Sequence, residues 1–264
     1  FQRFAHLDYF PLPGGDASIK RPYRSALSLL RRHSIDWDED LPCVVACGTE
    51  ERDVLRQQID RRLHSPPTSS MGRLFDAVAS LIGLRHTVSY EAQAAMELEY
   101  LAAQSIEGGL PPHAGFRMDL GGSEATGLTG NDAPGSRTEP AGSVNAFQVD
   151  LSLDESKPIT IDPGPVLRGL VSDLRDGIST PELAARFHYS VAKMIASVCH
   201  LAREGSGLNA VGLTGGVFQN VLLLELTEAR LRTAGFEVIT HTVVPPNDGG
   251  IALGQAVIAR NRIS

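Results

Sequence analysis

The spacing of apolar residues predicts a chain that is mostly helical through its middle. Apolar residues recur every three or four positions, as on one face of a helix, in several separate stretches. The predicted helices cover residues 23–33, 50–63, 72–81, 91–104, 165–175 and 180–203. In the second of these, the expected buried stripe is Val54, Leu55, Ile59 and Leu63. The opening segment 1–10 and the short runs 147–150 and 159–161 have the composition of strands.

Local signals mark where some of these elements begin and end. Ser69 or Ser70 is a natural N-cap for the helix 72–81, which should end near Gly83. Thr180-Pro181 starts the longest helix with proline at its first position. The segment 121–142 is rich in Gly, Ser, Thr and Pro, and we expect it to be a mobile loop or a connection that carries a hairpin.

Strand and helix alternate over the last 60 residues. The pattern predicts a strand at 210–214, a helix at 217–234, a strand at 236–240, a glycine turn, and a final helix at about 249–262. Such alternation is typical of βαβ units, so the two strands should be parallel.

Two glycine turns in this region suggest a ligand site. The first is Gly215-Gly216, between the strand and the helix, and the second is Asn247-Asp-Gly-Gly250. Glycine lets a ligand approach bare backbone, and the N–H groups that start the following helix suit a phosphate. Asn220, predicted one turn into that helix, can point toward the same cleft. Asp248 is either a metal ligand or the N-cap of the final helix, and Gly-Gly can also be plain turn geometry.

A few other side chains could carry chemistry. Asp76 lies at the border of an apolar stripe, where its two carboxylate oxygens could hold two ribose hydroxyls, or where it could simply be exposed or paired with arginine. Cys43 and Cys47 have the wrong spacing for a zinc finger, which favours small core residues. His188, inside the longest helix, is expected to be a packed or capped histidine. No G-x-S-x-G elbow and no P-loop lysine motif is present.

Composition limits the classes of function. The chain has 264 residues, 42% hydrophobic, and a net charge of −7, which disfavours nucleic acid as a partner. No apolar run approaches the roughly 20 residues that a membrane span needs, so no membrane partner is expected. Three cysteines indicate a reducing, cytoplasmic compartment. The first residue is Phe1, and we expect residues 1–264 to be part of something longer.

Together, five motifs resemble the HypF family, the carbamoyltransferases of [NiFe]-hydrogenase maturation, in family order and over essentially the whole chain. They are Phe10-Pro-Leu-Pro-Gly-Gly-Asp16, Ser69-Ser-Met-Gly-Arg-Leu-Phe-Asp-Ala-Val-Ala79, Tyr90-Glu-Ala-Gln-Ala-Ala-Met96, Leu213-Thr-Gly-Gly-Val-Phe-Gln-Asn220 and Pro245-Pro-Asn-Asp-Gly-Gly-Ile-Ala-Leu-Gly-Gln255.

The resemblance implies an α/β fold: an actin-like, Hsp70-type (ribonuclease H-like) ATPase lobe with largely helical insertions. It implies ATP and carbamoyl phosphate as substrates, a carbamoyl adenylate, and transfer of the carbamoyl group to the C-terminal cysteine of a HypE-like acceptor protein. Asp76 would hold the ribose, Gly215 and Gly216 would lie along the adenosine or phosphate, and Asn220 would be nearby. Asp248 matches the family's metal-binding aspartate, for a divalent ion such as iron or zinc.

The chain also departs from the family pattern. The family's two metal-binding histidines and its Asp-Gly phosphate loop are absent, as are its acylphosphatase-like, zinc-finger and adenylate-forming domains. Ala92 replaces a residue that is often Gly. The chain is therefore interpreted as the C-terminal part of a TsaD-like carbamoyltransferase module, whose other metal ligands lie outside it. The alternatives are a tRNA threonylcarbamoyl transferase, a small-molecule O-carbamoyltransferase, and a nucleotide-binding or docking module without turnover.

Overall fold

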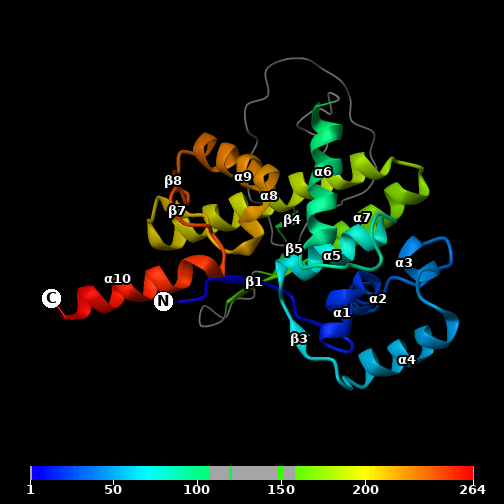
Figure 1. Cartoon of the computed structure of the whole chain (residues 1–264). Helices are drawn as coiled ribbons and strands as arrows, with labels where there is room; N and C mark the ends of the chain where they lie inside the picture. The colour runs from blue at the N-terminus through cyan, green and yellow to red at the C-terminus, as the bar shows by residue number, and fades with distance from the viewer. Residues whose placement is uncertain (1, 108–118, 121–147, 151–157, 264) are drawn as a thin grey trace, which may run out of the picture.

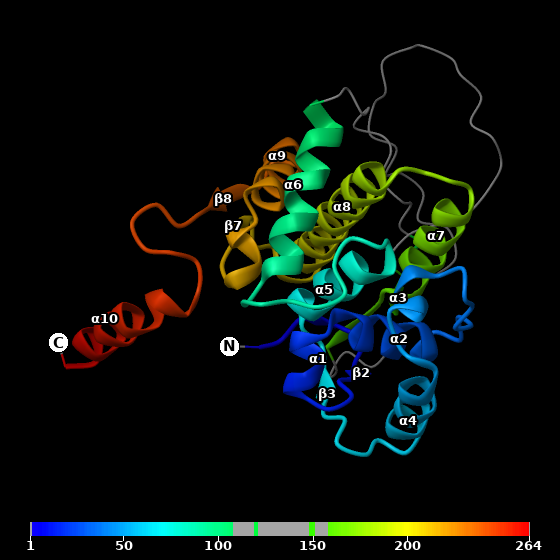
Figure 2. The same cartoon turned by 45° about the vertical axis from the view of Figure 1, so that its right-hand side comes forward.

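Packed helices make up most of the body in a computed structural model that describes residues 2–107, 119–120, 148–150 and 158–263. Helix α5 packs between α2 and α6, and α8 packs between α6 and α9 (Figures 1 and 2). The α-helices are α1 (Asp16–Lys20), α2 (Pro22–Arg32), α3 (Pro42–Val45), α4 (Thr49–Asp60), α5 (Met71–Leu81), α6 (Gln93–Glu107), α7 (Gly164–Arg175), α8 (Thr180–Ser206), α9 (Val221–Thr233) and α10 (Ile251–Ile263). Two short 3-10 helices are η1 (Gly216–Gln219) and η2 (Asp248–Gly250).

The strands are short and form three small sheets among the described residues. They are β1 (Ala5–Leu7), β2 (Phe10–Pro11), β3 (Pro67–Thr68), β4 (Asp119–Leu120), β5 (Gln148–Asp150), β6 (Ile159–Asp162), β7 (Ala210–Gly212) and β8 (Glu237–Ile239). The largest sheet has the order β1-β6-β5-β4, with β5 and β6 antiparallel and the other two pairings parallel. Strands β2 and β3 pair antiparallel, and β7 and β8 pair parallel, as predicted.

Helix α5 lies at the centre of the main core, because its apolar residues face neighbours on more than one side. Leu74, Phe75 and Val78 are fully buried, and the Phe75 ring meets the Phe187 ring of α8 edge to face at 4.9 Å. The predicted cap is confirmed: the Ser70 side chain accepts a hydrogen bond from Arg73 N, and the helix ends before Gly83, whose φ is +82°. Aromatic packing of this kind makes α5 a rigid support for the side chains at its start.

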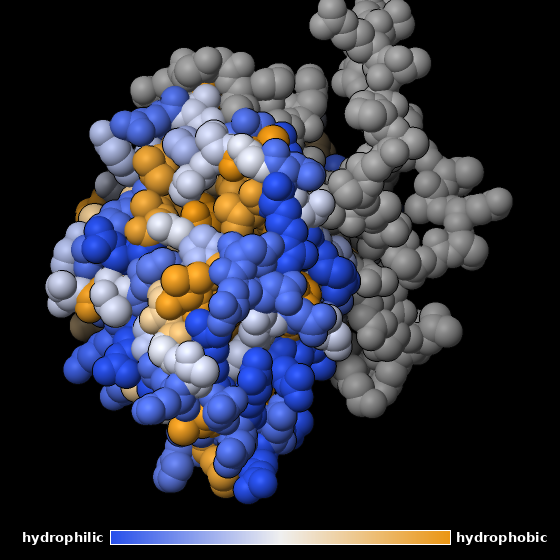
Figure 3. Space-filling model, turned by 90° about the vertical axis from the view of Figure 1, so that its right-hand side faces the viewer, coloured by the Kyte–Doolittle hydropathy of each residue, from blue (hydrophilic) through white to orange (hydrophobic). Residues whose placement is uncertain are grey.

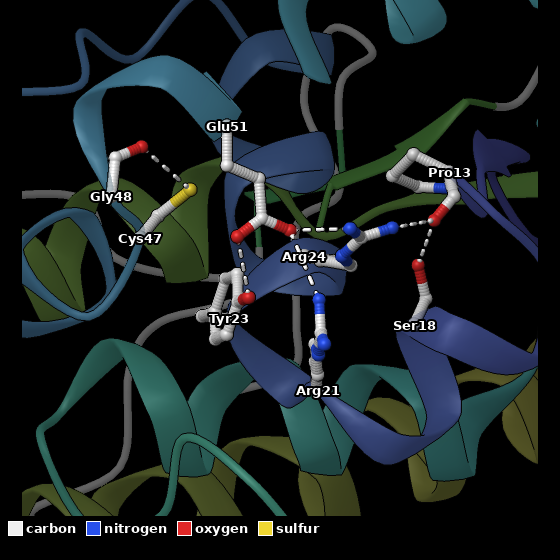
Figure 4. A network of polar contacts seen from close by, with 8 residues as sticks. All are labelled: Pro13, Ser18, Arg21, Tyr23, Arg24, Cys47, Gly48 and Glu51. Atoms are coloured by element: carbon white, nitrogen blue, oxygen red, sulfur yellow. Dashed lines mark hydrogen bonds and ion pairs between the residues drawn. The ribbon is translucent and has the colours of Figure 1, made fainter. Parts of the chain in front are cut away.

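The turn at Gly14-Gly15 is held by a partly buried network of polar side chains (Figure 4). Glu51 of α4 accepts hydrogen bonds from Tyr23 at 2.8 Å and from Arg24, and Arg24 also donates to the Pro13 carbonyl. A side chain on Gly14 would meet the Arg24 guanidinium, so the turn requires glycine there. Cys47, nearby, is buried, and desolvation raises its pKa to about 11; the pKa of Cys43 rises to about 12 for the same reason. Both cysteines are core residues, as expected.

Helix α10 differs from all other long helices of the described chain, because it extends from the body (Figures 1 and 2). Its apolar residues Ile251, Leu253, Val257 and Ile258 are each more than half exposed. By contrast, the face on the right of Figure 1 is mainly hydrophilic, with apolar residues in small separate patches (Figure 3). No described helix combines the length and apolar content that crossing a membrane requires.

Two predictions from the pattern were wrong in detail. Val54 is exposed, because α4 buries only one narrow line of side chains, Leu55 and Ile59. Leu63 is also exposed, and it lies beyond the end of α4 at Asp60. The helix predicted over 217–234 is two elements, η1 and α9, which are separated at Asn220, where the backbone is extended. The predicted loop 121–142 lies outside the described residues.

Candidate functional site

The two glycine turns meet at the carboxyl ends of the parallel strands β7 and β8. Gly215 N donates a hydrogen bond of 2.7 Å to the carbonyl of Pro246, which joins the first turn to the second. Ligands of open α/β sheets typically bind at the carboxyl ends of parallel strands. The structure therefore brings together two segments that the sequence separates by about 30 residues.

Gly215 and Gly216 present bare backbone at this edge. Gly215 has φ +100° and ψ 157°, a conformation that is essentially restricted to glycine. A Cβ on Gly215 would meet nothing within 4 Å, and one on Gly216 would meet only Gln219 Oε1 at 4.0 Å. The space beside both residues is open to a ligand.

The helix that should receive a phosphate is different from the one predicted. The N-terminus of α9 is satisfied within the protein, because Leu223 N donates to Asn220 Oδ1 at 2.7 Å and Leu222 N donates to Glu99 Oε1 at 3.1 Å. The N–H groups of Gly216 and Val217, which open η1, have no acceptor inside their own helix. An anion at this turn would therefore meet η1 rather than α9. Glu99 was missed because nothing in its local sequence indicates that it caps a helix so far along the chain.

Asn220 is the N-cap of α9 rather than a residue one turn inside a helix, which corrects the prediction. Its side chain is 9% exposed, and its Nδ2 lies 2.9 Å from His188 Nε2. His188 is fully buried, its Nδ1 lies 2.8 Å from the carbonyl of Ala184, and desolvation lowers its pKa to about 4. The neutral ring therefore donates from Nδ1 to the carbonyl and accepts from Asn220. Asn220 thus links the end of the glycine turn to the buried His188 and to the first turn of α9.

Asp76 is the most unusual carboxylate of the site. It is 3% exposed, and its Oδ2 lies 2.9 Å from Arg73 Nη1, without hydrogen-bond geometry. Burial raises its pKa to about 6, opposed by Arg73 and assisted by Glu91. No described residue donates a hydrogen bond to this carboxylate, so two hydroxyl donors from a ligand would satisfy it. Asp76 lies in the middle of α5, and α5 contacts η1.

The backbone at Ala92, just before α6, has a conformation that favours glycine. Ala92 has φ +62°, the left-handed conformation that glycine adopts without strain. Ala92 immediately precedes α6, and its neighbour Glu91 is close enough to influence Asp76. The left-handed backbone of Ala92 is therefore strained, and this strain lies next to Glu91.

We expect Ala92→Gly to raise the free energy of unfolding by about 0.5–1 kcal/mol. Relief of left-handed strain, about 1–2 kcal/mol, exceeds the entropy cost of the added glycine. Urea unfolding of the whole chain measures the change. Ala95→Gly, inside α6, is the matched control and should lower stability by a similar amount. A loss of stability in both variants would show that position 92 is not strained.

Asp248 is exposed and opens η2, while the neighbouring Asn247 acts as the cap by accepting a hydrogen bond from Gly249 N at 2.9 Å. The cap of η2 is therefore Asn247, and the alternative of Asp248 as the N-cap of α10 stays a prediction. A catalytic metal site usually has three protein ligands, and the described residues contain no group of three or more His, Cys, Asp or Glu side chains that could hold an ion. The described part of this chain does not fit a metal centre by itself.

Another cavity, of about 520 Å³, lies away from both glycine turns, between β2, α2 and α4. Its charged side chains are largely paired with each other, as in Arg31 with Asp60 and Arg32 with Asp8. Neither turn contributes to its lining. The glycine turns and Asp76 therefore remain the better candidate site.

His241 is a residue at the glycine turns to which the sequence drew no attention. Its Nε2 lies 2.8 Å from Thr214 Oγ1, and both residues follow the ends of their strands. Its position one residue after a predicted strand was the available signal, because strand ends carry ligand contacts in parallel sheets.

Comparison with known proteins matches this chain to one family of carbamoyltransferases. The family described as "Carbamoyltransferase, Kae1-like Domain, second subdomain" matches residues 1–120 and 137–255. The chain is 33% identical to the carbamoyltransferase HypF2 of Cupriavidus necator over 99% of its own length and 30% of that protein. It is 32% identical to HypF of Rhodobacter capsulatus over 100% of its length and 29% of that protein.

A solved structure is similar across the whole chain. It is described as full-length HypF in the phosphate- and nucleotide-bound form, and it has a TM-score of 0.79 and 34% identity, over 100% of this chain and 29% of that one. The helix-rich α/β fold therefore matches that of a known structure. The chain spans about 30% of the length of each of these proteins.

Proposed function

Because this chain belongs to the HypF family of carbamoyltransferases, we propose that it supplies the nucleotide-binding side of a carbamoyl-transfer site in a longer enzyme. The observation that carries the proposal is the hydrogen bond from Gly215 N to Pro246 O, which assembles both glycine turns at the carboxyl ends of β7 and β8. The similar full-length structure is described as nucleotide-bound, which supports a nucleotide at this place.

In the proposed complex, each part of an adenosine phosphate has a partner in this chain. Asp76, which receives no hydrogen bond from the described protein, accepts from the ribose hydroxyls. The backbone beside Gly215 and Gly216 approaches the adenosine or phosphate, because no side chain occupies that space. Asn220 is hydrogen-bonded to His188 and keeps the end of η1 in position, so that the preceding residues of η1 can contact the ligand.

The proposed reaction is ATP-dependent transfer of a carbamoyl group that derives from carbamoyl phosphate. A thiolate at the C-terminus of a HypE-like acceptor attacks the carbonyl carbon of a carbamoyl adenylate. A carbon–sulfur bond forms, the carbon–oxygen bond to the phosphate breaks, and AMP leaves with the electron pair. Positioned N–H groups lower the activation barrier of this transfer, because they stabilise the negative charge that develops on the phosphate.

The proposal also includes a fold type, a metal ion and a cellular compartment for the longer module. The actin-like, Hsp70-type ATPase lobe is the proposed fold type of the longer module, of which residues 1–264 form the C-terminal part. A divalent iron or zinc ion would take Asp248 as one ligand and the rest from outside this chain. The proposed compartment is the cytoplasm, because all three cysteines are free.

We expect Gly216→Val to weaken ATP binding by this chain by about tenfold or more, a loss of about 1.4 kcal/mol. A branched side chain would fill the space that the ligand is proposed to approach, yet it would not clash with the protein. Titration calorimetry with ATP measures the effect, and we expect the wild-type affinity itself to be weak.

Gly205→Val is the control for this experiment. Gly205 also has open space around a Cβ, but it lies in the last turn of α8. It should leave ATP affinity unchanged. If Gly216→Val binds ATP as tightly as the wild type, the nucleotide does not use this turn and the proposed function fails at this step.

A further inference from the structure

Thr214 and His241 form a pair on the open face of the β7–β8 sheet. Residues alternate along both strands: Leu213 and Val238 are buried against the helices, whereas Gly212, Thr214, Ile239 and His241 are exposed. The hydrogen bond from Leu213 N to Ile239 O extends the parallel pairing up to this point. Thr214 and His241 therefore stand at the carboxyl edge of the sheet, beside Gly215.

One tautomer of the His241–Thr214 pair suits an anion. In the neutral ring, a Thr214 hydroxyl that donates to Nε2 leaves the ring proton on Nδ1. No described residue accepts a hydrogen bond from Nδ1. That nitrogen is therefore a donor available to a ligand at the turn.

The charge pattern of the turns singles out His241. Residues 210–222 and 237–250 contain no lysine and no arginine, so His241 is the one side chain in either segment that can carry a positive charge. An arginine lies at the opposite ends of these strands. There, Arg203 donates to Asn209 and to the carbonyl of Ala234, before β7 and β8 begin. The other side-chain donors of the two segments, such as Thr214, Gln219 and Asn247, are uncharged.

We propose that His241, oriented by Thr214, contacts the phosphoryl group of the ligand bound at the two glycine turns. The ligand class is a phosphate ester or anhydride of a nucleotide, and the inference rests on the proposed function. His241 is a binding residue here, and Thr214 is a positioning residue that acts through it.

The test compares a charged and a neutral ligand on the same variants of the whole chain. His241→Ala should weaken binding of ATP by about tenfold, the effect of losing one charge-assisted hydrogen bond. It should leave binding of adenosine, which has no phosphate, unchanged. His241→Lys should restore part of the ATP affinity, because it returns a positive charge, and Thr214→Val should give a smaller loss for ATP alone.

Thermal unfolding of each variant separates binding from folding. An equal loss for ATP and adenosine, or an unchanged ATP affinity in His241→Ala, would overturn the inference while the nucleotide site itself stands. Failure of the lysine variant to recover any affinity would also count against a phosphate contact. A wild-type chain that binds neither ATP nor adenosine would instead overturn the proposed function, and the inference with it.

Discussion

Asn220→Ala is expected to lower the free energy of unfolding by about 2–4 kcal/mol. The substitution removes the cap of α9, which is worth about 1 kcal/mol. It also leaves the Nε2 of fully buried His188 without a partner, at a cost of about 1–3 kcal/mol. Urea unfolding followed by circular dichroism measures the change. This prediction reverses the sequence-based view of Asn220 as a residue that only faces the cleft.

The matched control is Asn247→Ala, at the other asparagine cap of the site. Asn247 accepts one hydrogen bond from Gly249 N on an exposed turn and has no buried hydrogen-bond partner among the described residues. Its loss should cost less than about 1 kcal/mol. If the two variants lose the same stability, the His188–Asn220 bond contributes nothing beyond an ordinary cap.

In the proposed longer enzyme, we expect Asp248→Ala to slow carbamoyl transfer by roughly 10²–10³-fold, the range for loss of one preorganised polar group. Asp248 is exposed on the turn that bonds to Gly215, so its removal costs little packing but takes a charge from the site. Mass spectrometry of a HypE-like acceptor, after incubation with ATP and carbamoyl phosphate, should show no carbamoyl adduct on its terminal cysteine.

Asp176→Ala is the control for this activity test. Asp176 is also an exposed acid, but it lies at the C-terminal end of α7. Its variant should transfer at the wild-type rate. Full activity of Asp248→Ala would remove Asp248 from the site. If the wild-type enzyme modifies tRNA or a small-molecule alcohol and leaves the cysteine unmodified, the acceptor named in the proposal is wrong.

The raised pKa of Asp76 makes the free energy of unfolding depend on pH. Its pKa is raised to about 6 from an ordinary value of 3.8, mainly by desolvation. A carboxyl whose folded-state pKa is raised favours the folded state when protonated. That favourable contribution is present below about pH 4 and is lost as the pH rises through about 6. At neutral pH the protein therefore bears the cost of a buried charge, which is the pattern found at functional sites.

Most helices could be predicted from sequence because their causes are local. The 3.6-residue period of apolar positions located α2, α5 and α8, since one buried face is written directly in the spacing. Ser70 and Gly83 marked the ends of α5 because caps act within one turn. The glycine turns were recognisable for the same reason, and Gly215 has the backbone angles that only glycine tolerates.

Other features depend on partners far along the chain, and only the tertiary structure revealed them. Asn220 becomes a buried cap because His188, 32 residues earlier, lies against it. Glu99 caps α9 across 123 residues, and Pro246 closes the site by accepting from Gly215. Periodicity states which face of an element is buried but not which neighbour covers it. The sequence by itself therefore determined the family, the elements and the glycine turns. Packing decided which polar groups are paired inside the protein and which, like the Asp76 carboxylate and the Nδ1 of His241, have no hydrogen-bond partner among the described residues.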